Sequence, residues 1–451
     1  MLRWLLLVVA VAALAVGGYF GAAKLTSDKI VAAAPGPTAG FADAGAAPAT
    51  AVAPGGAPAA AAAVATRVEA LLADPRLGPH VLAEIRDATT GDLLYDHAGT
   101  SSASPASTAK ITTATAVLAT HAATDRITTR VLAGASPGTV VLVGGGDPTL
   151  SAAPAGTATP YADAARLSDL ATQLKGVTVL GQPVTQLVYD TSLFIGPAVS
   201  PDWDPTDVPT EYASPITALM ADGGRDTPTS TIRSADPAGA AARALATDLG
   251  LTAVSPGTAP AGAATLASVQ SPPIGELVAQ MLGPSDNVIA EMLARQVALA
   301  ANAAPSFTGA AAAVASVLNG LGVANVSPLL DGSGLARGDR IAPDELTQLL
   351  HIDATTPKLA PVLAGLPVAG WDGTLADRFT GSSAAGAGLV RAKTGTLTSV
   401  SSLAGVVHDA DGRLLAFSFV ADQVGPASAD TDAAEAALDD VAAQLAGCGC
   451  S

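Results

Sequence analysis

Three short polar segments that lie far apart in the sequence most strongly constrain how this chain can fold. In chain order they are Ser107-Thr108-Ala109-Lys110, Ser285-Asp286-Asn287 and Lys393-Thr394-Gly395. About 175 residues separate the first segment from the second, far more than one layer of helices needs to bring two segments together. If the three segments form one site, part of the intervening chain must be an insertion.

The predicted insertion has a composition of its own. The stretch from residue 126 to residue 266 alternates β-like runs with glycine-containing turns, which is typical of one or two β-rich domains. The sequence therefore predicts a discontinuous catalytic domain, made of residues 66–125 and 267–447, with inserted β-rich structure over residues 126–266.

The first segment has the composition of an activated nucleophile. Of six lysines in the chain, only Lys110 has a serine three positions before it. A serine hydroxyl needs a base to remove its proton, and a lysine can act as that base when burial or a nearby cation lowers its pKa. Ser104-Pro105-Ala106-Ser107 is typical of a helix start, so Ser107 and Lys110 should lie on one helical face. The helix N-terminus would also bring positive partial charge near a developing oxyanion.

The other two segments supply complementary groups. Ser285 and Asn287 would provide a proton relay and an amide hydrogen bond. Residues 388–396 have strand character, and Gly395 would let another backbone approach closely. Lys393 would then present a fixed cation at the edge of a strand, as the binding of a C-terminal carboxylate requires.

Each segment also has a purely structural interpretation. Lys110 could be a solvated helix lysine, Ser285 a cap for a helix over residues 287–298, and Lys393 a charge that protects an edge strand from aggregation. Three such coincidences in the required order are far less probable than one, so we favour a shared site.

Further segments make a family resemblance specific. They are Val141–Leu150, Asp331–Leu335, Gly370–Leu375 and Arg391–Thr396. With the three polar segments, they resemble the D-alanyl-D-alanine carboxypeptidase/endopeptidase family, the class C low-molecular-mass penicillin-binding proteins, over about residues 66–425. The glycines of the first two segments are interpreted as turn residues that need positive φ, without a part in the chemistry.

The resemblance implies a fold and a set of roles. The fold would be an α+β transpeptidase/β-lactamase-like domain, an antiparallel sheet flanked by helices. Ser107 would be the nucleophile, Lys110 its base, and Ser285 and Asn287 the second catalytic motif. Substrate binding would fall to Lys393, Thr394, Gly395 and Thr396, with the carboxylate held by Lys393 and Thr394 and the oxyanion by the backbone amides of Ser107 and Thr396.

The implied activity is that of an exported serine-type D-Ala-D-Ala carboxypeptidase, or also an endopeptidase, acting on peptidoglycan stem peptides and acylated by β-lactam antibiotics. Two rivals stay open. A β-lactamase shares all three motifs, but the class A type needs a later glutamate, and no glutamate lies between Glu291 and Glu345. A catalytically silent wall-binding scaffold is the second rival, and the intact Ser107, Lys110 and Lys393 speak against it.

Other features exclude alternative chemistries. Gly134-Ala135-Ser136-Pro137-Gly138 fits the Gly-x-Ser-x-Gly pattern but lies between two β-like runs, so a hairpin turn is predicted instead of a hydrolase elbow. The five histidines lack metal-ligand spacing, so neither a metal nor another cofactor is expected. A net charge of −17 argues against nucleic acid as a partner. The only cysteines, Cys448 and Cys450, are interpreted as peripheral, because a disulfide between them would be strained.

The N-terminus indicates export. Arg3 precedes an apolar run from Trp4 to about Ala23, long enough to span a bilayer. We expect residues 1–25 to be a membrane anchor, with a cleaved signal peptide and secretion as the alternative. Residues 26–65 would be a disordered Ala/Pro/Gly-rich linker that holds an extracytoplasmic catalytic domain off the membrane.

Overall fold

A five-stranded antiparallel sheet joins the early and late parts of the chain. In the computed structural model, which describes residue 56 and residues 58–451, the strand order is β10-β11-β12-β1-β2. Its strands are β1 (Val81–Asp87), β2 (Leu93–His97), β10 (Val390–Leu397), β11 (Val400–His408) and β12 (Leu414–Ala421). Neighbouring strands are all antiparallel, and β11 and β12 form a hairpin. The predicted α+β fold is confirmed.

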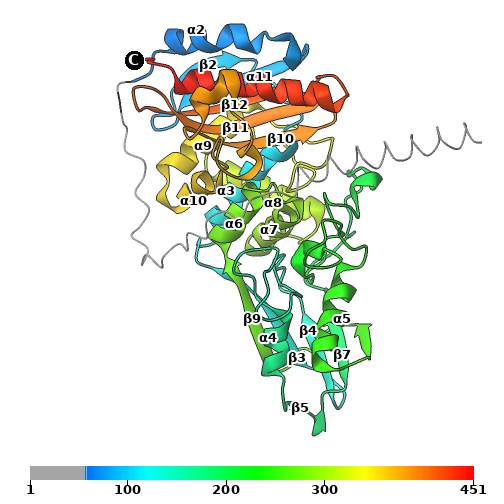
Figure 1. The fold of residues 1–451 in the computed structure, drawn as a ribbon. Helices are drawn as coiled ribbons and strands as arrows, with labels where there is room; N and C mark the ends of the chain where they lie inside the picture. The colour runs from blue at the N-terminus through cyan, green and yellow to red at the C-terminus, as the bar shows by residue number, and fades with distance from the viewer. Residues whose placement is uncertain (1–55, 57) are drawn as a thin grey trace, which may run out of the picture. The chain divides into compact units, whose positions relative to one another are not determined.

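Strand β12 shows that the sheet is a central layer. All eight of its residues are buried, because helices cover both faces of the sheet. On one face lie α2 (Ala61–Leu72) and α11 (Ser428–Ala446), drawn in blue and red in Figure 1. Phe417 and Phe419 belong to the core on this face, whereas Leu414 and Ala416 belong to the core on the other. The strand thus alternates between two cores with a period of two.

The second face is covered by a group of helices around α3. These helices are α3 (Lys110–Thr120), α6 (Ile274–Leu282), α7 (Asn287–Ala300), α8 (Phe307–Gly320), α9 (Pro343–Thr355) and α10 (Ala360–Gly365). Helix α3 is central, with every residue from Lys110 to Leu118 buried. It contacts α6, α7, α8 and α9, so its first residue, Lys110, which ends the first polar segment, is fixed on several sides.

The chain between α3 and α6 forms a second sheet with the strand order β8-β7-β4-β3-β9. Its strands are β3 (Arg126–Ala133), β4 (Thr139–Val143), β7 (Gln186–Asp190), β8 (Val254–Pro256) and β9 (Thr265–Pro273). Two helices pack on it, α4 (Leu167–Gln173) and α5 (Pro237–Leu249), and a small ribbon pairs β5 (Thr178–Val179) with β6 (Gln182–Pro183). The β4–β7 and β7–β8 pairs are parallel. The insertion is therefore a mixed α/β element, less purely β than predicted.

The turn between β3 and β4 settles one sequence prediction. Gly134 donates from its amide to the carbonyl of Thr139 at 2.9 Å, and Gly138 has φ of +68°. No helix follows Ser136, because β4 begins at Thr139. The predicted hairpin turn is confirmed, and Ser136 has no hydrolase elbow around it.

Two predictions about the chain ends are wrong. The predicted linker includes residues 61–65, but these residues form the first part of α2, whose Val64 and Val68 are fully buried against the sheet. Cys448 and Cys450 are not peripheral. They are buried and joined as a disulfide, because the chain bends after α11 and brings their Cα atoms to 5.1 Å, within the range a disulfide needs.

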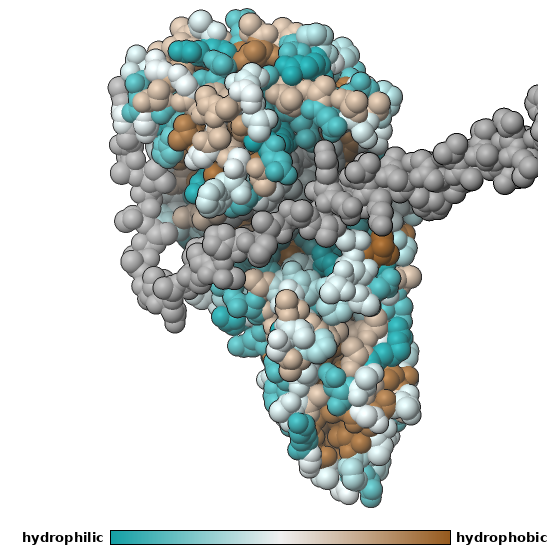
Figure 2. All heavy atoms as spheres, in the orientation of Figure 1, coloured by the Kyte–Doolittle hydropathy of each residue, from teal (hydrophilic) through white to brown (hydrophobic). Residues whose placement is uncertain are grey.

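The predicted anchor, residues 1–25, lies outside the described residues, as does the linker up to residue 55. Among the residues that the structure describes, no helix combines the length and apolarity that crossing a bilayer requires. The visible surface of these residues mixes hydrophilic and weakly apolar groups with scattered hydrophobic patches (Figure 2).

Helix α2 gives a stability prediction. A chain that begins at Thr66 loses the first turn of α2 and the buried Val64, and it also loses the 2.6 Å hydrogen bond from the Ala60 amide to the Cys450 carbonyl. We expect its free energy of unfolding to be about 2–4 kcal/mol lower than that of a chain beginning at Pro58. Urea denaturation of both chains measures the difference. Equal midpoints and equal slopes would show that the start of α2 contributes nothing.

Candidate active site

Ser107 and Lys110 lie at the start of the central helix. The chain enters α3 through a 3₁₀ helix, Ala106–Ala109, instead of the α-helical turn that the sequence suggested. Lys110 is fully buried, Ser107 is partly exposed, and the Lys110 Nζ to Ser107 Oγ distance is 2.8 Å. Ala106, directly before the serine, has φ of +46°, a left-handed conformation that costs a non-glycine residue energy. The expected contact between the two side chains is present.

Lys110 has two further hydrogen-bond acceptors, each from a distant part of the chain. Its Nζ donates to Oδ1 of Asn287 at 2.6 Å and to the backbone carbonyl of Ser333 at 2.8 Å. Asn287 is the first residue of α7, and its Nδ2 donates to the carbonyl of Tyr212 at 3.2 Å. The amide of Asn287 is thereby oriented with its oxygen toward the lysine.

Burial sets the protonation of Lys110. Removal from water lowers the pKa of its amine to about 8, although the carboxylates of Asp331, Asp286 and Glu291 oppose this shift. Roughly one amine in ten is then neutral at pH 7, far more than for a solvated lysine. Lys110 can therefore accept a proton near neutral pH, and the interpretation of Lys110 as a solvated helix residue is wrong.

Ser285 is placed differently from the other predicted motif residues. It has φ of +62° and is partly buried, and Asp286, not Ser285, caps helix α7. Among the described residues, its hydroxyl makes no hydrogen bond to Ser107 or Lys110. A proton relay through Ser285 therefore remains a prediction, because neither of these hydrogen bonds is present.

Strand β10 lies directly against the turn that carries Ser107. A Cβ atom on Gly395 would come within 2.5 Å of the Pro105 carbonyl oxygen and 3.1 Å of the Ser107 amide nitrogen. Ser402, on the neighbouring strand β11, donates to the same Pro105 oxygen at 2.7 Å. The predicted close backbone approach at Gly395 is present, and it places the Ser107 amide beside the edge strand of the sheet.

Lys393 differs from its prediction as an edge cation. Its side chain is fully buried, and its Nζ donates to the Thr394 carbonyl at 2.9 Å. Burial, together with the charges of Lys110 and Arg378, holds the pKa of Lys393 well below its usual range. A strand at the edge of a sheet is not necessarily exposed, because neighbouring segments can cover it. A carboxylate partner would oppose this pKa shift and favour the charged form of Lys393.

The neighbouring threonines point to two other segments. Thr394 donates from Oγ1 to Oγ1 of Thr374 at 2.8 Å, and the Thr374 amide donates to the Gly283 carbonyl at 3.1 Å, just before the second motif. Thr396 is exposed, and its Oγ1 donates to Oε1 of Glu435 on α11 at 2.6 Å. The third motif is thus connected to the second motif and to the C-terminal helix.

The Asp331–Gly334 loop takes part in the site, contrary to the prediction that it is only a turn. Asp331 is fully buried and accepts hydrogen bonds from the amides of Ser333, Gly334 and Ala336 and from the Trp203 indole at 2.7 Å. These bonds fix the loop whose Ser333 carbonyl accepts from Lys110.

The helix-covered antiparallel sheet, with its hydrogen-bonded Ser-x-x-Lys pair beside a Lys-Thr-Gly edge strand, defines the penicillin-recognising class of serine enzymes. A family model for the D-Ala-D-Ala carboxypeptidase 3 (S13) family matches residues 64–232 and 226–445. The chain belongs to this family, and the protein is a serine-type D-Ala-D-Ala carboxypeptidase.

Individual relatives agree. A carboxypeptidase of Mycobacterium tuberculosis is 43% identical over 404 residues, covering 87% of this chain and 85% of the relative. The carboxypeptidase DacB of Mycolicibacterium smegmatis is 42% identical over 398 residues, covering 86% and 84%. Among solved structures, penicillin binding protein 4 from Haemophilus influenzae superposes with a TM-score of 0.67 at 24% identity, covering 85% of this chain and 98% of that one. That structural likeness shows the fold.

Proposed function

We propose that Ser107 is the nucleophile and that neutral Lys110 is the base that activates it. The 2.8 Å contact between Ser107 Oγ and Lys110 Nζ carries the assignment, and the pKa of about 8 supports it. With Lys110 neutral, the serine O–H donates to Nζ. Asn287 Oδ1 and the Ser333 carbonyl accept hydrogen bonds from Nζ, so they orient the amine and favour the ammonium that forms when it takes the proton.

The proposed reaction is acyl transfer through an ester on Ser107. As Oγ attacks the carbonyl of the penultimate D-Ala, its proton passes to Lys110, and the oxyanion is met by the amides of Ser107 and Thr396. The amide C–N bond breaks, Lys110 returns the proton to the leaving nitrogen, and D-Ala departs. Water then attacks the ester and regenerates Ser107. Lys393 and Thr394 would hold the substrate's terminal carboxylate.

Peptidoglycan stem peptides are the proposed substrates, and β-lactams the proposed covalent inhibitors. Support comes from the family and from a relative of the same fold, penicillin binding protein 4 from Haemophilus influenzae, solved in complex with a β-lactam. The same acyl-enzyme would serve endopeptidase cleavage of cross-links. The hydrogen bond between Ser107 and the buried Lys110 speaks against a catalytically silent scaffold.

We further propose that the enzyme works outside the cytoplasmic membrane, attached through residues 1–25. The substrate class and the apolar run after Arg3 support this location. Cleavage of that segment and secretion is the alternative, and N-terminal sequencing of the mature protein distinguishes the two.

Covalent labelling tests the nucleophile. We expect a β-lactam to form a stoichiometric ester on Ser107, because its strained carbonyl replaces the D-Ala-D-Ala amide. Mass spectrometry of the digested protein locates the adduct, and Ser107→Ala should remove it. Ser136, which lies in a hairpin turn, is the matched control, and Ser136→Ala should label fully. An adduct on Ser136 or Ser333 would refute the assignment.

A further inference from the structure

The middle residue of the second motif, Asp286, connects two parts of the molecule. Its Oδ1 accepts from the amides of Val288 at 2.9 Å and Ile289 at 3.1 Å, which caps helix α7. Its Oδ2 accepts from the Tyr161 hydroxyl at 2.8 Å and from Nη2 of Arg233 at 3.0 Å. The carboxylate therefore connects two parts of the molecule: Oδ1 binds the start of α7, and Oδ2 binds Tyr161 and Arg233.

Both side chains on Oδ2 belong to the insertion, as does Arg225, whose Nη2 lies 3.9 Å from the same oxygen. The Asp286 and Arg233 side chains are 5% and 4% exposed, so water screens this ion pair little. Burial alone would raise the pKa of Asp286, but Arg233 and Arg225 outweigh it and hold the pKa well below its usual range. The carboxylate is thus charged and depends on the insertion for its counter-charge.

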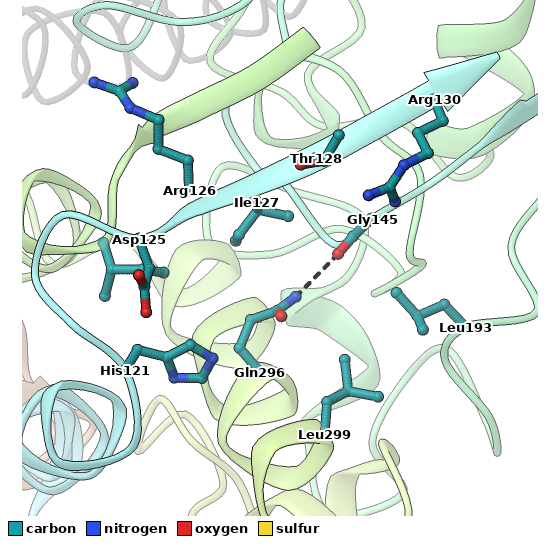
Figure 3. A pocket seen from close by; sticks show the side chains of 11 residues that line it. His121, Asp125, Arg126, Ile127, Thr128, Arg130, Gly145, Leu193, Gln296 and Leu299 are labelled. Atoms are coloured by element: carbon teal, nitrogen blue, oxygen red, sulfur yellow. Dashed lines mark hydrogen bonds between the residues drawn. The ribbon is translucent and has the colours of Figure 1, made fainter. Parts of the chain in front are cut away.

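Helix α7 also meets the insertion elsewhere. Asn287, directly after Asp286, donates from Nδ2 to the Tyr212 carbonyl at 3.2 Å. Near the other end of the helix, Gln296 donates to the Gly145 carbonyl at 3.0 Å, beside a cavity of about 290 Å³ that His121 and Arg126 also line (Figure 3). The insertion therefore holds α7 near both of its ends.

We propose that Arg233 is a positioning residue for the reaction: by pairing with Asp286 it fixes the start of α7, and so holds Asn287 on Lys110. The inference rests on the proposed roles of Ser107 and Lys110. The insertion then contributes to catalysis, because its Arg233 supplies the charge that keeps the second motif in place. Arg233 lies more than 50 positions before Asp286 in the sequence.

Acylation kinetics with a labelled penicillin test this proposal. Arg233→Met should lower the maximal acylation rate constant by about 10- to 100-fold while leaving the affinity of the non-covalent complex unchanged, because the chemistry is misaligned and the binding strand β10 is untouched. Arg233→Lys keeps the charge and should recover a large part of the rate. Arg233→Met combined with Asp286→Asn should also recover rate, because no uncompensated buried charge remains.

Arg166→Met is the matched control. Arg166 also lies in the insertion, but its guanidinium binds the carbonyls of Ala153, Pro154 and Thr157 and contacts no motif residue. It should acylate at the parental rate. Equal losses in Arg166→Met and Arg233→Met would overturn the proposal, as would a folded Arg233→Met that acylates normally. Failure of the parental protein to acylate Ser107 at all would instead refute the proposed function.

A milder variant covers the case in which Arg233→Met does not fold. Tyr161→Phe removes only the hydroxyl that donates to Asp286, and it keeps the aromatic ring in place. It should lower the maximal acylation rate about 3- to 10-fold with unchanged affinity for penicillin. If Arg233→Met does not fold, a folded Tyr161→Phe with the parental rate constant would contradict the proposal.

Discussion

Lys110→Arg should reduce acylation by a β-lactam about 1,000-fold or more. The substitution keeps a cation beside Ser107 but removes the titratable amine, since a guanidinium does not lose its proton in the accessible pH range. Lys110 is fully buried, and its Nζ is hydrogen-bonded to Ser107, Asn287 and Ser333. Stopped-flow labelling with a fluorescent penicillin measures the rate.

The pH dependence of the parental protein provides a second measure of this role. Below its pKa, Lys110 holds a proton and cannot accept another, so acylation should rise with pH and level off above about 8. The acylation rate of Lys110→Arg should not show this rise with pH. Lys358→Arg is the matched control, because the Lys358 Nζ bonds only the Ala119 carbonyl at 2.6 Å among the described residues. Near-parental acylation by folded Lys110→Arg would show that another group is the base.

Lys393→Ala should abolish the preference of the enzyme for substrates with a free C-terminal carboxylate. We expect kcat/KM for a peptide acid to fall about 100-fold or more, while kcat/KM for the matching peptide amide changes little. A buried lysine and a substrate carboxylate form a charge-assisted hydrogen bond. When the lysine is removed, no water takes its place at the carboxylate in the buried site. Lys393→Arg should retain more of the preference. An unchanged ratio of acid to amide in Lys393→Ala would show that the carboxylate binds elsewhere.

Proton uptake separates this role from a general loss of binding. The pKa of Lys393 is held well below its usual range in the free protein, and an incoming carboxylate raises it. Binding of a peptide acid should therefore take up a proton at pH values between the pKa of Lys393 in the free protein and its pKa in the complex, which calorimetry in two buffers of different ionisation enthalpy detects when the pH is varied. The uptake should disappear in Lys393→Ala and for the peptide amide. Buffer-independent heats with the parental protein would contradict it.

The local part of the site could be predicted from the sequence. A three-residue offset in a helical segment brings Ser107 to Lys110 regardless of the remaining fold, and the actual 3₁₀ turn preserves the contact. Strand β10 and the β11–β12 hairpin follow from short-range patterns of apolar residues and turns. Glycine at position 395 indicated a close backbone approach, although not which backbone approaches.

The sequence by itself determined the order and identity of the reacting groups, because side-chain chemistry depends on residue type. Tertiary structure alone decided what surrounds them. The carbonyls of Tyr212 and Ser333 accept from Asn287 and Lys110, yet any residue type carries a carbonyl, so no pattern could reveal them. The sequence predicts Lys393 as an exposed cation on an edge strand, but the neighbouring segments bury its side chain. This burial lowers its pKa. Arg233 reaches Asp286 only because the insertion folds back on α7, a contact between distant positions that no local rule encodes.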